Sequence, residues 1–268
     1  MKITKLMAAA AAALAAGAAA AAPIYPTFTV DTSALSGGGS LGTFVSNDIS
    51  GQYHEQLTFT SASTFVVSLD FVAQGFNYDD TDASASTSLT AAQTGLGSNY
   101  EVLAILNGTG TYSTSGGATT FSLTPGGALT VSYDAGAKAS FNAPAAPGGS
   151  FTINANGDVI TTLANGVGIS GNGSVDCTAP NLCGAFGQET SFALTAAGSS
   201  FFVAPSPFYG LNLQSGQIEG FPIVVGETVT SSGTLNAVFE SPIPEPAPVA
   251  MMGLALLGFM VVRQRRRD

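Results

Sequence analysis

The sequence predicts an all-β protein with a single antiparallel domain, β-sandwich-like or a meander, between two apolar terminal segments. Apolar and polar residues alternate with a period of two in many short runs, as in strands with one buried face. Clusters of Gly, Asn, Ser and Pro separate these runs and are typical of turns. No segment between residues 27 and 241 shows the periodicity of a convincing helix.

The alternating runs follow one another along the chain. In residues 53–60, the odd positions form one face and the even positions, from His54 onward, form the other. Asn156-Gly157 predicts a two-residue hairpin, because a type I′ turn needs positive φ at both positions. Residues 136–149, rich in Ala, Gly and Pro, are expected to form a long loop or a domain boundary. Further predicted strand faces are Phe65, Val67, Leu69 and Phe71; Phe121 and Leu123; Leu129, Val131 and Tyr133; Phe151 and Ile153; Phe192 and Leu194; and Leu235, Ala237 and Phe239.

The charge distribution indicates an anionic body. Of the seven Lys and Arg residues, only Lys138 lies outside the terminal segments, whereas acids are spread from Asp31 to Glu245. Phosphate binding needs clustered Lys or Arg, so we expect no nucleic-acid partner. The surface is compatible with docking onto exopolysaccharide, and the alternative is a solvated acidic surface.

The N-terminus has the pattern of a secretory signal peptide over residues 1–22. Lys2 and Lys5 precede an apolar run from Leu6 to Ala22, and the small residues 20–22 suit a signal peptidase. A retained helix is the alternative. Residues 23–241 would then form a β-rich extracellular domain.

The C-terminus carries three signals in a fixed order. Pro244-Glu245-Pro246 comes first, then the apolar run 247–262, then a basic cluster of Arg263, Arg265, Arg266 and Arg267. As a helix the run spans about 24 Å, which is marginal for a transmembrane helix. The arginines favour the cytoplasmic side, so they act as a membrane stop and a cytoplasmic lock.

These three signals resemble the PEP-CTERM sorting signal, which membrane enzymes called exosortases process in Gram-negative bacteria. The resemblance covers residues 242–268, about a tenth of the chain. It implies exosortase as a processing partner and Pro244, Glu245 and Pro246 as the sorting motif. The protein would be anchored in the inner membrane before processing, and then reach the cell surface or extracellular matrix. A plain tail anchor with a Pro-rich stalk is the alternative.

Two further groups of residues are candidate sites. Cys177 and Cys183 are the only cysteines, and export favours a disulfide between them over free thiols. Asp79, Asp80 and Asp82 could converge on Ca²⁺, but no EF-hand or Gly-rich calcium repeat surrounds them. A solvated loop is the alternative for this acidic cluster.

The catalytic motifs in the chain lack their structural context. Residues 38–42 match a nucleophile elbow, and residues 166–171 match a dinucleotide fingerprint, but neither precedes a helix. One His and two Cys argue against zinc catalysis. No pair of acids is singled out for glycoside hydrolysis, and the absence of Trp counts against a sugar-binding cleft. We therefore expect no enzyme activity and no cofactor.

The function expected from these observations is a structural or adhesive role in the extracellular matrix. The body is similar to flocculation-associated PEP-CTERM proteins in three strings, residues 28–31, 190–195 and 201–209. This resemblance implies a role in exopolysaccharide-dependent aggregation, as in flocculation or biofilms. A secreted carbohydrate-binding module and, third, a secreted hydrolase are the alternatives.

Overall fold

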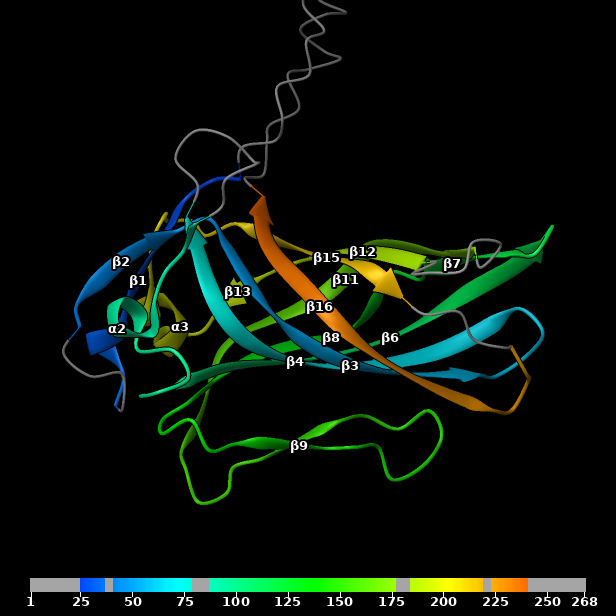
Figure 1. Cartoon of the computed structure of the whole chain (residues 1–268), viewed down its shortest axis with the longest axis horizontal. Coiled ribbons are helices and arrows are strands. Elements are labelled where there is room, and N and C mark those ends of the chain that lie inside the picture. Colours follow the sequence, from blue (N-terminus) through cyan, green and yellow to red (C-terminus); the bar gives the residue numbers. More distant parts are fainter. Residues whose placement is uncertain (1–24, 37–40, 79–86, 177–183, 219–222, 241–268) are drawn as a thin grey trace, which may run out of the picture.

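The computed structural model describes residues 25–36, 41–78, 87–176, 184–218 and 223–240, and most of them lie in antiparallel strands (Figure 1). The all-β prediction is confirmed. The elements are β1 (Phe28–Asp31), η1 (Thr32–Ala34), β2 (Thr43–Ser46), β3 (Asp48–Phe59), β4 (Thr64–Tyr78), β5 (Thr87–Ser88), α2 (Ala91–Thr94), β6 (Glu101–Ser115), β7 (Ala118–Leu123), β8 (Gly126–Asp134), β9 (Ser140–Asn142), β10 (Thr152–Asn154), β11 (Ile160–Asp176), β12 (Gly184–Thr190), β13 (Ala193–Leu194), α3 (Ala196–Phe201), β14 (Phe202–Ala204), β15 (Gly210–Ile218) and β16 (Thr228–Glu240).

The main sheet closes on itself. Its strands pair in the cyclic order β3, β4, β6, β8, β11, β12, β15, β16 and back to β3. Strand β7 extends β8 and pairs with the distal parts of both β6 and β11. Neighbours in the ring follow one another along the chain, so the connectivity is that of a meander. The β-sandwich-like alternative was wrong: one sheet curls until its first and last strands pair, so no second sheet is needed to cover its apolar face.

The interior of the closed sheet holds the side chains that the alternation predicts. On β3 the odd positions, including Tyr53 and Phe59, are buried, while His54 on the other face is exposed. On β4 the residues from Phe65 to Phe71 that were predicted to share a face are buried in the same way. The period-two pattern therefore predicted which face of β3 and of β4 points inward.

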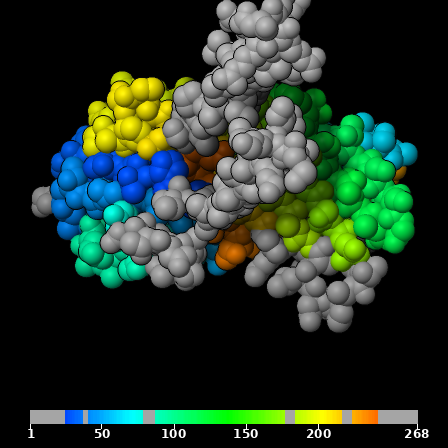
Figure 2. Space-filling model, turned by 90° about the horizontal axis from the view of Figure 1, so that it is seen from above, coloured from blue at the N-terminus to red at the C-terminus, as the bar shows by residue number. Residues whose placement is uncertain are grey.

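A small three-stranded sheet and α3 cover one end of the closed sheet. Strand β1 pairs with β2 and β14, and the ring of Phe28 lies 4.8 Å from that of Phe239 and 5.9 Å from that of Phe202. The N-terminal strands and the segment around α3 and β14 lie side by side in the space-filling view (Figure 2). The strings 28–31, 190–195 and 201–209 meet here, because the ring of Phe192 also lies 6.1 Å from that of Phe202. We call this region the aromatic cap.

Residues 135–159 form a flap outside the closed sheet, next to β3 and β4 (Figure 1). Residues 136–149 form the long loop that was predicted there, except that Ser140–Asn142 is strand β9, which pairs with β10. Phe151 N donates to Ser68 Oγ at 3.0 Å, and Gly148 N donates to Thr58 Oγ1 at 2.8 Å. These bonds seat the flap on the outer face of the sheet.

The turn predicted at Asn156-Gly157 is present. Both residues have positive φ, 49° and 92°, and Asp158 N donates to Ala155 O at 2.8 Å. The hairpin expected around it is absent, because β10 pairs backward with β9 and not with the strand that follows the turn.

The described helices are short. Helix α3 begins after Thr195, whose Oγ1 accepts a 3.0 Å hydrogen bond from Gly198 N, and α2 covers a single turn. Across the described ranges, no helix has the length and apolar character needed to cross a membrane. The predicted signal peptide 1–22 and transmembrane helix 247–262 lie outside the described residues.

Candidate functional site

The site residues predicted from sequence all lie outside the described part of the chain. They are Pro244, Glu245 and Pro246; Arg263, Arg265, Arg266 and Arg267; Cys177 and Cys183; and Asp79, Asp80 and Asp82. The sorting, disulfide and calcium assignments for these residues therefore stay predictions. Among the residues that are described, no three His, Cys, Asp or Glu side chains form a group suited to a metal ion.

A groove of about 680 Å³ lies between the flap and the outer face of β4, β3 and β16. We call it the flap groove. Its walls carry His54, Asp70, Ser232 and Thr230 from the sheet, together with Phe141 and Phe151 from the flap. Hydroxyl, imidazole, carboxyl and phenyl groups thus face one open space.

A histidine–carboxylate pair lies in the wall of the flap groove. His54 and Asp70 are cross-strand partners on β3 and β4, and His54 Nδ1 lies 3.0 Å from Asp70 Oδ1. The Asp70 side chain is 2% exposed, whereas the His54 side chain is 62% exposed. Burial raises the pKa of the Asp70 carboxyl, and the hydrogen bond from His54 acts in the opposite direction. The buried Asp70 therefore holds a polar imidazole, that of His54, in the open groove.

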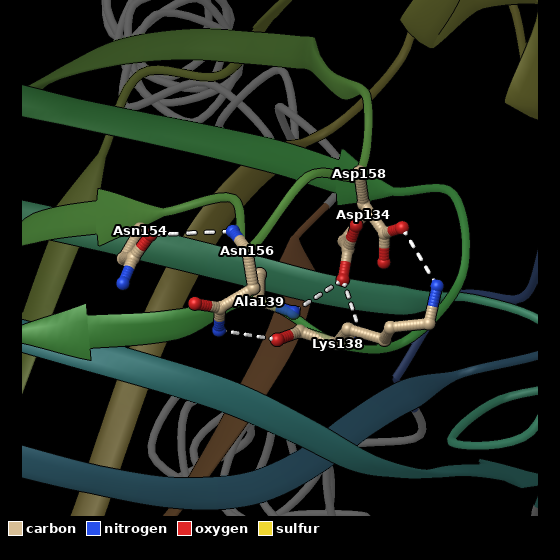
Figure 3. A network of polar contacts seen from close by, with 6 residues as sticks. All are labelled: Asp134, Lys138, Ala139, Asn154, Asn156 and Asp158. Atoms are coloured by element: carbon tan, nitrogen blue, oxygen red, sulfur yellow. Dashed lines mark hydrogen bonds and ion pairs between the residues drawn. The ribbon is translucent and has the colours of Figure 1, made fainter.

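A polar network holds the base of the flap (Figure 3). Asp134 Oδ2 accepts hydrogen bonds from Lys138 N and Ala139 N, both at 2.8 Å. Lys138 Nζ lies 3.0 Å from Asp158 Oδ1, and Asn156 Nδ2 donates to Lys138 O at 2.7 Å. These contacts connect the two ends of the flap and fix its position over the groove.

The cross-strand row Ser232, His54 and Asp70 contains the residue types of a hydrolase triad. A nucleophile and its base need a mutual hydrogen bond, or a geometry close to one. Within the described residues, no hydrogen bond joins Ser232 to His54. The row thus places a hydroxyl, an imidazole and a carboxyl side by side on the outer face of the sheet.

A second ionisable group lies inside the closed sheet, where sequence reasoning expected no site. Glu55 is 8% exposed, and its Oε2 accepts a 3.1 Å hydrogen bond from Ser231 Oγ. Burial raises the pKa of Glu55 to about 7. The signal in the sequence is a glutamate within the otherwise apolar face of Tyr53, Leu57 and Phe59. A cavity of about 40 Å³, lined mainly by apolar side chains, lies next to this carboxyl.

Comparison with known proteins identifies the tail. The family model described as the PEP-CTERM protein-sorting motif matches residues 242–267. The chain carries a PEP-CTERM sorting signal. No curated protein and no solved structure matches the chain. The match spans the three signals singled out in the sequence, and it does not reach the strings that suggested the flocculation-associated family.

The PEP-CTERM signal indicates how this protein is exported and processed. It marks an exported protein whose C-terminal sorting signal is anchored in the membrane and processed by an exosortase. The body of this PEP-CTERM protein is the closed sheet with its flap groove, and the sorting signal begins directly after the last described strand, which ends at Glu240.

Proposed function

We propose that this PEP-CTERM protein is a structural or adhesive component of the extracellular matrix and is not an enzyme. After signal peptidase and exosortase have acted, it resides on the cell surface or in the matrix of a Gram-negative bacterium. There it supports exopolysaccharide-dependent aggregation, as in flocculation or a biofilm. The observation that carries the proposal is the flap groove with its His54–Asp70 pair, on a protein that is exported.

The chemistry of the groove favours a saccharide. A carboxylate and an imidazole bind hydroxyl groups through charge-assisted hydrogen bonds, and Ser and Thr hydroxyls both donate and accept. Phe141 is partly exposed in the groove and offers an apolar face to the C–H side of a sugar ring. The Phe side chains thus take the place of the missing Trp.

The charge of the body favours a neutral polymer. Lys138 is the only Lys or Arg in the body, and its Nζ is already paired with Asp158. An anionic polysaccharide would meet no free Lys or Arg there and would be repelled by the acidic surface. We therefore expect the groove to hold an uncharged, hydroxyl-rich chain.

The test uses mature protein recovered from the cell exterior and neutral exopolysaccharide purified from the same host. We expect binding by calorimetry, weakened about tenfold or more by His54→Ala or Ser232→Ala. Ser113→Ala is the matched control, because Ser113 is an exposed strand serine outside the groove. Deletion of the protein should also reduce cell aggregation, and the Ser113→Ala variant should restore it.

The results of these assays distinguish an adhesin from a carbohydrate-binding module and from a hydrolase. Glycan binding with unchanged aggregation would identify a carbohydrate-binding module and not an adhesin. Release of sugar or acyl products, abolished by Ser232→Ala and by His54→Ala, would identify a hydrolase. Equal behaviour of wild type and groove variants in both assays would contradict the proposal.

A further inference from the structure

A polar strip runs along the outer faces of β16 and β3. Its members are paired across the two strands and none has an apolar side chain. On β16 the residues 230, 232, 234 and 236 are all exposed to solvent. The four cross-strand pairs are Thr230 with Gln56, Ser232 with His54, Thr234 with Gln52, and Asn236 with Ser50.

The strip extends from the flap groove to a second hollow. Thr230 and Ser232 line the flap groove at one end, whereas Asn236 lines a hollow of about 630 Å³ over β11, β12 and β15. We call the second hollow the amide trough. The two hollows are thus joined by one strand, β16, whose outward side chains from Thr230 to Asn236 are all hydroxyls or an amide.

One cross-strand row crosses the amide trough, beside a second row of Ser170, Glu189 and Asn212. Asn172, Gly187, Gln214 and Asn236 are successive partners on β11, β12, β15 and β16. Gly187 has no side chain, so its backbone forms the floor of the trough. The space above it is open, because a Cβ there would meet nothing closer than 3.8 Å. Amide side chains on both sides of the floor carry donors and acceptors, and this pattern fits vicinal hydroxyl groups.

One buried atom on the strip has no partner. Gln56 Oε1 is buried and receives no hydrogen bond from any of the described residues. A buried acceptor left unsatisfied costs about 1–3 kcal/mol. Gln56 pairs with Thr230, so this acceptor belongs to the part of the strip that meets the flap groove.

We propose that the flap groove, the strip and the amide trough form one continuous track for a single extended neutral polysaccharide chain. This inference rests on the proposed function and adds the length and path of the ligand. The six residue steps from Thr230 to Asn236 cover about 20 Å at the rise of a strand. That length exceeds a single sugar unit, so affinity should grow with chain length until both hollows are filled.

A polypeptide is a less suitable occupant. Peptide and protein partners are held mainly by large apolar or aromatic anchors in desolvated pockets. Apart from Phe141 and Phe151 in the flap groove and Phe186 in the trough, the track offers none. Hydrogen-bonding groups spread evenly over a long, open path instead suit a polymer that repeats the same hydroxyl pattern.

The experiment measures binding of neutral β-linked glucose oligomers of increasing length to the mature protein by calorimetry. The variant that tests the track is Gln214→Ala combined with Asn236→Ala, at the end remote from His54. Both side chains are exposed, so circular dichroism should show an unchanged fold. Ser113→Ala again serves as the control.

We expect wild-type affinity to rise with oligomer length. The double variant should bind the shortest recognised oligomer within about twofold of wild type, and the longest one about tenfold more weakly. Affinity independent of length, or a double variant equal to wild type with long oligomers, would overturn the track. If His54→Ala still abolished binding in that case, the proposed function would stand. Binding of peptides but of no glycan would overturn both.

Discussion

Ser231 Oγ donates a 3.1 Å hydrogen bond to Glu55 Oε2, so a glutamic acid is held within the apolar interior of the closed sheet by a neighbouring hydroxyl. Desolvation raises the pKa of Glu55 to about 7, and the bond from Ser231 only partly opposes this shift. In the folded protein the carboxyl therefore keeps its proton over a range in which the unfolded chain releases it.

Stability should consequently depend on pH through Glu55. Its pKa is about 7 in the fold and 4.5 in the reference state, so the folded protein binds more protons between these values. The free energy of unfolding should fall as the pH rises from about 4.5 to about 7, by up to about 3 kcal/mol, and then level off. Glu55→Gln should remove this contribution and be more stable than wild type above about pH 7. Urea denaturation across this range measures it, with exposed Glu189→Gln as the control. Parallel pH curves for wild type and Glu55→Gln would contradict the prediction.

Gly51 should not tolerate a side chain. A Cβ at this position of β3 would lie 2.1 Å from the carbonyl oxygen of Val72 on β4, so the two backbones would have to separate. Gly51→Ala should lower the free energy of unfolding by about 2 kcal/mol or more. Gly187→Ala, on β12 with open space above it, should change stability by less than about 0.5 kcal/mol. Thermal unfolding of the two variants measures this difference in stability. Equal melting temperatures would show that β3 and β4 can move apart to accommodate the methyl group.

The flap should loosen when Asp134 is replaced. Asp134 Oδ2 accepts hydrogen bonds from Lys138 N and Ala139 N, and Asp134→Ala would leave both donors without this partner. In Asp134→Ala we expect faster amide exchange in the flap than in wild type, and faster proteolytic cleavage between residues 138 and 156. Exchange in the ring strands should stay close to wild type. Asp158→Ala should have a smaller effect, because it removes an ion pair whose lysine is 66% exposed. Uniform exchange changes throughout the body would argue against a separately held flap.

Cys177 and Cys183 should be joined by a disulfide in protein from the cell exterior. They lie between β11 and β12, which are antiparallel neighbours and pair up to Val175 and Gly184. Thiol labelling of the folded, unreduced protein should modify neither cysteine, and labelling after reduction should modify both. Stoichiometric labelling of both cysteines before reduction would refute the pairing.

Substitution of Pro244-Glu245-Pro246 by alanines should block processing but not insertion. The apolar run 247–262 and the arginines are unchanged, so the hydrophobic driving force for membrane insertion is the same. Full-length protein should accumulate in the membrane fraction, and the extracellular form should disappear. Removal of Arg263, Arg265, Arg266 and Arg267 should instead weaken retention and topology before any cleavage. Equal amounts of one mature species from wild type and the Pro-Glu-Pro variant would show that the tripeptide has no role in sorting.

Local patterns were enough to predict β3, β4, β8 and β16 and their buried faces, but β6, β11 and β15 were not predicted. Tyr53 and Phe71 are buried where the alternation placed them, and Asn156-Gly157 turns as its residue types require. Closure of the sheet was not predictable in this way, because the pairing of β16 with β3 joins residues between 170 and 190 positions apart. The flap groove was missed for the same reason. His54 and Asp70 meet only through the register of β3 with β4, and the flap strands β9 and β10 are too short to show a period.

The aromatic cap has a mechanical consequence for an anchored protein. Phe28 in the first strand and Phe239 in the last are in ring contact, so the chain enters and leaves the body at the same end. Tension on the C-terminal tail would act along the axis of β16, whose ladders with β3 and β15 lie parallel to the load. The hydrogen bonds of both ladders would then be strained together in shear and not opened one after another.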